Sequence, residues 1–344
     1  MLTSDQNRKI NEIVEEFKEA ADFYRMEYSE DLMGMFRDFG CMLLLKCKVD
    51  TEGKADLERL LEGRHKLKGT VKRQLMTVSE ELAQLWEPGE QDGSGDTGEY
   101  EGSQNVREMF QTALEEIFHF CLYSKGGKNR YLLPEETAKP LLRLLTFPEG
   151  MMAGNEGLVV LDTQCGAGSV LMAASRYLKN PRLMGYEKDE EMWAAAVIMS
   201  QLSGLEMELH LEDGARADLY ESCDLVISNP VYGTDTIKDE ELIDQLPGEL
   251  KTVRGRYHME LIRSMQALNF DGKAMLIVPN SFLFANRTES MKVRKWLLQS
   301  YSLEAIISLP EDTFMYSGVR SGVMVFSKPF MSGGWEGHTQ RVLY

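Results

Sequence analysis

Short apolar runs alternate with segments of helical spacing along the chain from residue 130 onward. The apolar runs predict strands at residues 158–161, 183–187, 207–211, 225–228, 274–279, 305–308 and 323–327. Hydrophobic residues recur at helical spacing in residues 170–178, 190–203, 257–269 and 287–300. Strands that alternate with helices predict a mostly parallel sheet with helices on both faces. Because no helix separates the last two strands, one of them is a candidate for an antiparallel strand.

The part before residue 129 has a different pattern and predicts an all-helical N-terminal domain, residues 1–128, ahead of a second domain, residues 129–344. Amphipathic helices are expected within residues 4–49, 54–63, 75–87 and 106–123, with Ser79 as a cap. Residues 88–105 are rich in Gly and acidic residues and predict a flexible loop. The basic stretch at 64–73 is either a solvated helix face or a patch that contacts phosphates.

Composition narrows the classes of function. The net charge of −17 means that any surface for nucleic acid must be a local basic patch or must come from a basic partner. The five cysteines are scattered and the five histidines are isolated, so neither a disulfide framework nor a metal site is expected. No segment is apolar enough to cross a membrane and no signal peptide opens the chain, so we expect a cytoplasmic protein.

Four consecutive predicted strands end on polar residues: Asp162, Glu187, Asp213 and Asn229. The carboxyl ends of parallel strands meet at one edge of a sheet, where open α/β sheets bind their ligands. The sequence therefore predicts a crevice lined by these four side chains. At any single strand end, a surface acid or a turn residue would explain the same side chain.

The turn after the first of these strands runs from Asp162 through Cys165, Gly166 and Gly168. Its glycines allow positive φ and a close approach of the backbone to a ligand. It lacks the third glycine of the dinucleotide fingerprint, and Asp162 would repel a pyrophosphate. A ligand with positive charge fits better, although such a turn can also be purely structural.

Two further acids complete a candidate ligand site. Glu187 could accept from the hydroxyls of a ribose, and Asp213 from the exocyclic amine of adenine. An adenosine with a cationic group would use both acids together with Asp162. S-adenosylmethionine has this composition.

The order of these motifs carries a family resemblance. An Asp-x-x-Cys-Gly-x-Gly turn, a Gly-x-Glu strand end and the Asn229-Pro230-Val231-Tyr232 corner together resemble the amino-group DNA methyltransferases. The segments at 270–284, 293–298 and 303–310 narrow the resemblance to modification subunits of type I restriction–modification systems. The similarity extends over residues 131–328.

This resemblance implies a Rossmann-like class I S-adenosylmethionine-dependent methyltransferase domain that methylates the N6 amine of adenine in DNA. It implies that Asn229 and Pro230 accept from the target amine, and that Tyr232 and Phe314 cover the two faces of a flipped base. It also implies a cofactor contact at Tyr131 and a separate specificity subunit. Relative to the family, the chain is expected to be truncated at its C-terminus.

Three positions depart from the family pattern. Val231 replaces a second proline, Thr163 follows Asp162 where proline is common, and Leu133 stands where a threonine would contact the cofactor. Two alternatives remain open: a methyltransferase for protein glutamine, or a catalytically weak or inactive methyltransferase-like binding module.

Overall fold

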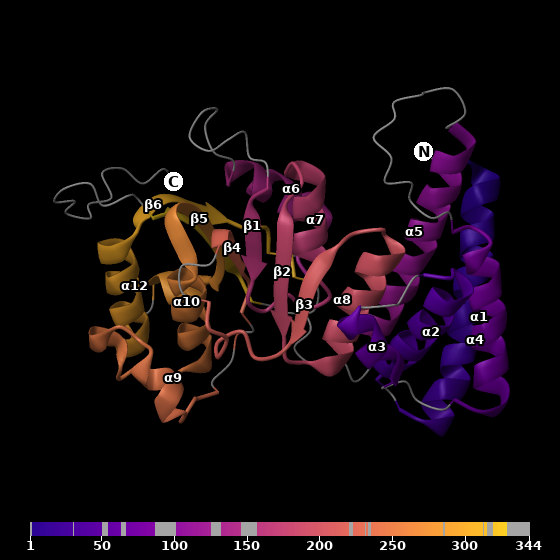
Figure 1. Ribbon diagram of the computed structural model, residues 1–344, viewed down its shortest axis with the longest axis horizontal. Helices are drawn as coiled ribbons and strands as arrows, with labels where there is room; N and C mark the ends of the chain where they lie inside the picture. Colours follow the sequence, from indigo (N-terminus) through magenta and orange to yellow (C-terminus); the bar gives the residue numbers. More distant parts are fainter. Residues whose placement is uncertain are drawn as a thin grey trace. The chain divides into compact units, whose positions relative to one another are not determined.

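We analysed a computed structural model of the chain, shown in Figure 1. It describes residues 2–29, 31–49, 54–62, 67–86, 101–124, 132–145, 157–219, 223–230, 232, 235–284, 286–311, 313–314 and 319–328. The chain divides into two compact units. One contains Met1–Arg130 and Ala194–Glu206, and the other contains Tyr131–Trp193 and Met207–Tyr344.

The first unit is helical. It contains α1 (Ser4–Glu27), α2 (Met33–Lys46), α3 (Ala55–Glu62), α4 (Gly69–Ala83) and α5 (Glu101–Leu122). The hydroxyl of Thr3 accepts from the backbone N–H of Gln6 in a capping box that opens α1. Helices α1 and α2 both pack against α4 and α5. Phe17 and Phe39 meet edge to face in their core, with ring centroids 5.0 Å apart.

Two predictions for this unit are wrong in detail. Ser79 does not cap a helix, because α4 already begins at Gly69 and the buried Ser79 hydroxyl donates to the carbonyl of Met76. The predicted loop at 88–105 ends earlier than expected, since α5 starts at Glu101. Residues 88–100 of that loop lie outside the described part of the chain, as do residues 64–66 of the basic stretch.

A helix from the second half of the sequence also contributes to the first unit. Helix α8 spans Glu190–Leu202, and from Ala194 onward its residues group with the N-terminal helices. Gly40 of α2 allows close packing there, because a Cβ at this position would lie 2.4 Å from the Ile198 side chain. The sequence pattern placed this helix in the second domain, since periodicity does not reveal which unit a helix packs against.

The second unit is built on a seven-stranded sheet of order β3-β2-β1-β4-β5-β7-β6. The strands are β1 (Val159–Asp162), β2 (Arg182–Glu187), β3 (Met207–Leu211), β4 (Cys223–Ser228), β5 (Leu268–Pro279), β6 (Ser302–Ser308) and β7 (Ser321–Ser327). The first five are parallel, and β7 runs antiparallel to both β5 and β6. The prediction of a mostly parallel sheet with one antiparallel strand near the end is confirmed.

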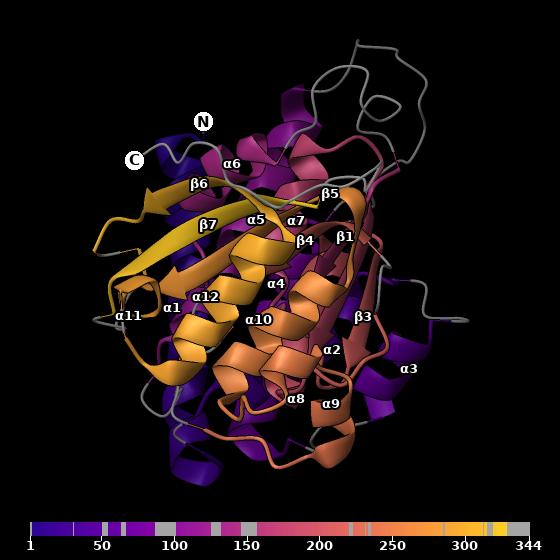
Figure 2. The same cartoon turned by 90° about the vertical axis from the view of Figure 1, so that its left-hand side faces the viewer.

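Helices cover both faces of the sheet. On one face, α10 (Arg256–Gln266) and α12 (Thr288–Ser300) lie side by side, as Figure 2 shows. On the other face, α7 (Ser169–Tyr177) packs against β1 and β2 and contacts α6 (Glu135–Leu144). The short elements α9 (Glu240–Asp244), η1 (Gly248–Leu250) and α11 (Asn280–Phe284) complete the unit. Because β4 and β1 are adjacent, their carboxyl ends meet beside each other.

Candidate active site

The turn after β1 has the conformation that its glycines permit. Gly166 and Gly168 have φ values of 55° and 77°, in the left-handed region that disfavours other residues. The N–H of Cys165 donates to the carbonyl of Tyr186 at 2.9 Å, and the N–H of Gly166 donates to Glu187 Oε2 at 2.9 Å. These bonds hold the turn against the end of β2, so the first two predicted strand ends do lie together.

Glu187 is fixed by backbone donors. Its Oε1 accepts from the N–H of Asp189 at 2.7 Å, and its Oε2 accepts from Gly166 as described above. Burial raises the pKa of the Glu187 carboxyl, and the hydrogen bonds from Asp189 and Gly166 oppose this rise. Each oxygen keeps a second lone pair, with which the carboxylate can accept from a ligand hydroxyl.

Asp162 is a buried carboxylate at the end of β1, with 2% of its surface exposed. Its Oδ1 accepts from the N–H of Gln164 at 3.0 Å. Burial raises the pKa of Asp162 to about 7, and the negative charge of Glu187 adds to the rise. No ion pair is recorded for Asp162 within the described parts of the chain. A cationic ligand would therefore stabilise the ionised form of this group.

The third predicted acid, Asp213, already has a cationic neighbour. Its Oδ2 lies 2.5 Å from Arg256 Nη2, and its Oδ1 accepts from the N–H of Ala215 at 3.2 Å. Arg256 Nε also donates to the buried Glu260 at 2.9 Å, and burial raises the pKa of Glu260 to about 7. The sequence analysis missed this network, although the i, i+4 spacing of Arg256 and Glu260 on one helix was a signal for their pairing.

The Asn229 corner follows β4 directly, next to the β1 turn. Asn229 is half-buried and Pro230 is buried. Tyr232 is held from two sides: its hydroxyl donates to Ser321 Oγ at 3.3 Å, and its ring packs edge-on against Tyr257 with centroids 5.7 Å apart. Burial raises the pKa of Tyr232 to about 12, so the phenol stays neutral. The corner thus presents amide and carbonyl groups beside a fixed aromatic ring.

Hydroxyl groups join the β1 turn, the end of β4 and α10. The hydroxyl of Ser228 donates to Gln164 Oε1 at 3.0 Å. Thr163 Oγ1 lies 2.5 Å from Ser264 Oγ, and the Ser264 hydroxyl donates to the carbonyl of Glu260 at 2.7 Å. Thr163, one of the three departures from the family pattern, is therefore bonded into the support of the site. The Ser264–Glu260 bond is local, but the other contacts, together with one between Ser264 and Ser228, join positions 36 to 101 residues apart, and no local motif predicts them.

The remaining predicted residues are less fully placed. Cys165 is buried, and burial raises the pKa of its thiol, which stays protonated. Phe314 is buried in the segment after β6, and Leu133 is buried ahead of α6. Tyr131 and Val231 lie outside the described residues. The roles of Tyr131, Phe314 and the other predicted site residues stay predictions.

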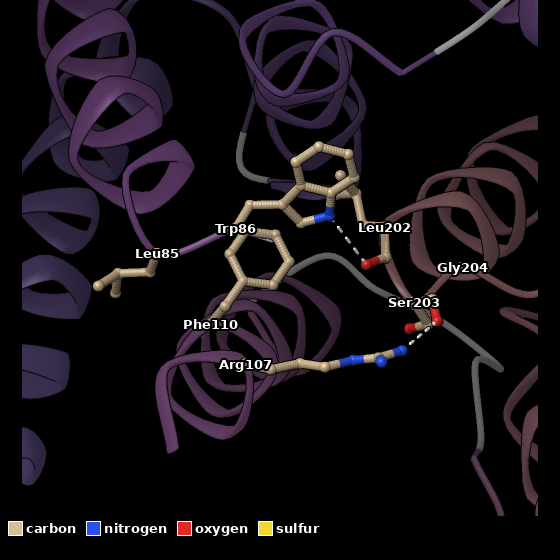
Figure 3. A pocket seen from close by; sticks show the side chains of 7 residues that line it. All are labelled: Leu85, Trp86, Arg107, Phe110, Leu202, Ser203 and Gly204. Carbon is tan, nitrogen blue, oxygen red and sulfur yellow. Dashed lines mark hydrogen bonds between the residues drawn. The ribbon is translucent and has the colours of Figure 1, made fainter. Parts of the chain in front are cut away.

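A separate pocket belongs to the helical unit (Figure 3). Trp86 Nε1 donates to the carbonyl of Leu202 at 3.3 Å, and Arg107 Nη2 donates to the carbonyl of Ser203 at 3.2 Å. The rings of Trp86 and Phe110 lie beside these contacts in Figure 3. Since the carbonyls at the end of α8 would otherwise lack partners, these side chains cap that helix, and we assign the pocket a structural role.

The described residues also bear on metal binding and membrane insertion. No group of three or more His, Cys, Asp and Glu side chains in those ranges is arranged to hold a metal ion. No helix in the same ranges is long and apolar enough to span a membrane.

Comparison with known proteins decides the family of this chain. The model of the family described as N-6 DNA methylase matches residues 107–342, which include every strand of the sheet and the whole Asn229 corner. The chain belongs to the N-6 DNA methylase family.

Individual relatives of this chain are distant. The MjaVII type I restriction enzyme methylase subunit of Methanocaldococcus jannaschii is 24% identical over 298 residues, covering 79% of this chain and 47% of that protein. The type II restriction enzyme and methyltransferase RM.BcgI of Heyndrickxia coagulans is 27% identical over 191 residues, covering 50% and 28%. The chain spans less than half the length of these relatives.

A solved structure shows the same fold. The type I restriction-modification system methyltransferase subunit of Streptococcus thermophilus superimposes with a TM-score of 0.61 at 16% identity. The match covers 94% of this chain and 86% of that structure. The predicted fold, a class I methyltransferase sheet preceded by a helical part, is confirmed.

Proposed function

We propose that this chain transfers a methyl group from S-adenosylmethionine to the N6 amine of adenine in DNA, as the modification subunit of a restriction–modification system. The observation that carries the proposal is the position of Asn229-Pro230 at the end of β4, directly beside the Asp162 turn at the end of β1. The amide and carbonyl groups that would hold the methyl acceptor therefore lie next to the buried carboxylate that favours a cationic ligand. Family membership supports the same activity.

The cofactor fits the residues at this edge of the sheet. Asp162 is buried with only a backbone donor to its Oδ1, and Glu187 is held by two backbone N–H groups. Positive charge on a ligand would offset the cost of burying the Asp162 carboxylate, while Glu187 could accept from ribose hydroxyls. When bound, S-adenosylmethionine supplies an electrophilic methyl group on a positively charged sulfur.

The acceptor corner has a defined chemical task in this proposal. The side-chain oxygen of Asn229 and the carbonyl oxygen of Pro230 each accept a hydrogen bond from one N–H group of the adenine amine. These hydrogen bonds orient the amine so that its nitrogen lone pair points out of the ring plane, toward the methyl group to be transferred. This alignment provides much of the acceleration of methyl transfer. The methylated amine is acidic enough to release its extra proton to water, and no strong base is required.

The target base must leave the duplex to reach this corner. Tyr232, held by Ser321 and Tyr257, is the proposed surface on which the flipped adenine stacks. Such stacking stabilises a base by about 1–3 kcal/mol. We assign recognition of the DNA sequence to a separate specificity subunit. We also propose that the activity is cytoplasmic.

Asn229→Ala tests the proposal. We expect methyl transfer to DNA to fall at least about 100-fold, because one of two acceptors of the target amine is lost. The affinity for S-adenosylmethionine should change less than about twofold. Transfer of labelled methyl groups to DNA and calorimetric titration measure the two quantities, with the exposed Asn286→Ala as the matched control. Wild-type transfer rates in Asn229→Ala would remove the acceptor assignment.

A further inference from the structure

The side-chain amide of Gln164 has one atom with a hydrogen-bond partner and one atom without. Its Oε1 accepts from the Ser228 hydroxyl at 3.0 Å, which fixes the amide between the ends of β1 and β4. Its Nε2 is buried and has no hydrogen-bond partner among the residues that the structure describes. A buried N–H donor without a partner is costly, so such a group calls for a specific explanation.

The backbone of the same turn offers few free donors. The N–H of Gln164 donates to Asp162 at 3.0 Å, that of Cys165 to Tyr186 at 2.9 Å, that of Gly166 to Glu187 at 2.9 Å, and that of Gly168 to Cys165 at 2.8 Å. Phosphate-binding loops work differently, because their backbone N–H groups point at the ligand. Apart from the N–H groups at the start of α7, which lack partners within the helix, the unused donor at this turn is the side-chain atom Gln164 Nε2.

The strand order indicates which part of a ligand would meet Gln164. Along β3-β2-β1-β4, the strand ends present Asp213, Glu187, the Asp162 turn and Asn229 in that order. If the ribose lies at Glu187 and the transferred methyl faces Asn229, the amino-acid tail of the cofactor lies at the β1–β4 boundary. That tail carries a carboxylate, which Asp162 and Glu187 would repel. It therefore needs a donor at this boundary.

We propose that the side-chain amide of Gln164 binds the carboxylate of the amino-acid tail of S-adenosylmethionine. The inference rests on the proposed function and adds a cofactor-binding residue to it. The hydroxyl of Ser228, which belongs to the strand that carries the acceptor corner, holds the Gln164 oxygen and turns the amide nitrogen toward the tail. One side chain thus connects the cofactor turn with the methyl acceptor.

Two ligands separate this role from a purely structural one. S-adenosylhomocysteine has the carboxylate, and 5′-methylthioadenosine shares the thioether and the adenosine but has no amino-acid tail. Dissociation constants for both are measured by calorimetry on the full chain, wild type and Gln164→Leu. We expect Gln164→Leu to lower the affinity for S-adenosylhomocysteine by about 10-fold to 100-fold, the usual effect of losing a hydrogen bond to a charged group. The affinity for 5′-methylthioadenosine should stay within about twofold.

A second variant and two controls sharpen the result. Gln164→Glu keeps the size of the side chain and the acceptor for Ser228 but adds a negative charge. It should therefore lower the affinity for S-adenosylhomocysteine more than Gln164→Leu does, and leave the affinity for 5′-methylthioadenosine unchanged. Ser228→Ala should reproduce only part of the loss, and the exposed Gln299→Leu should reproduce none. Thermal unfolding checks that every variant is folded.

The outcomes distinguish the two proposals. An equal loss of affinity for both ligands in the Gln164 variants, or no loss for either, would overturn the role of Gln164. The methyltransferase proposal would stand, and the N–H groups at the start of α7 would then hold the carboxylate. If wild-type protein binds neither ligand nor S-adenosylmethionine, the proposed function fails and this inference fails with it.

Discussion

Asp162 is the residue at which burial and charge oppose each other most directly. With its pKa raised to about 7 by burial, the carboxyl is largely protonated below that pH in the ligand-free protein. A cationic ligand favours the ionised form, so binding must displace a proton at low pH. We therefore expect the affinity for S-adenosylmethionine to fall by up to about tenfold per pH unit below pH 7. Calorimetry at pH 6, 7 and 8 measures this, and Asp162→Asn should flatten the profile.

The same carboxylate should destabilise the ligand-free fold. Its pKa is about 7 in the folded protein against an ordinary value of 3.8 for an exposed aspartate, so the unfolded chain releases the proton more easily. The destabilisation is complete above pH 7 and shrinks as the pH falls toward 4. Asp162→Asn should raise the free energy of unfolding by about 1–4 kcal/mol at pH 8, and by less at pH 5.5. Urea unfolding measures this, with the exposed Asp244→Asn as control. An Asp162→Asn protein less stable than wild type at pH 8 would contradict the expectation.

Among the elements, the strands were easier to predict than the contacts that build the site. Strand β3 was predicted at its observed bounds, and β1, β2 and β4 within two residues. Strands β1, β2 and β4 are short and largely apolar, β3 alternates apolar with polar residues, and a polar residue marks the end of each. Strand β5 begins at Leu268, where the helical pattern of α10 was expected to continue. The pairing of Arg256 with Asp213 and of Ser264 with Thr163 depends on how α10 packs against the sheet. A local pattern contains no information about such packing.

The turn after β3 packs against the turn after β1 at Gly214. A Cβ at this position would lie 2.2 Å from the carbonyl oxygen of Thr163, a backbone atom that moves only if the β1 turn moves. Gly214→Ala should therefore displace the Asp162 turn, weaken S-adenosylmethionine binding by at least about 10-fold and destabilise the fold by about 1–3 kcal/mol. At Gly248 a Cβ would meet nothing within 4 Å, so Gly248→Ala is the matched control. Unchanged cofactor affinity in Gly214→Ala would show that the two turns are not coupled.

At the scale of the whole molecule, charge opposes the proposed substrate. The chain has a net charge of −17, and DNA binding depends on neutralising phosphates with basic side chains. The residues of the active site do not compensate for this, because the strand ends contribute Asp162, Glu187 and Asp213 and the nearby Arg256 is paired with Asp213 and Glu260. A partner with a basic surface would solve this problem, in agreement with the proposed specificity subunit.

The chain alone should then bind duplex DNA weakly and with little dependence on salt, because few phosphates are neutralised. Fluorescence anisotropy with a labelled duplex, from about 50 to 200 mM salt, measures the affinity and its slope against salt concentration. Addition of the partner subunit should raise the affinity and steepen the slope by about 0.9 for each new phosphate contact. Titration of S-adenosylmethionine into the chain alone is the control, since the cofactor site needs no partner. Tight binding of a specific duplex by the chain alone would mean that this chain itself contains the DNA-recognition surface.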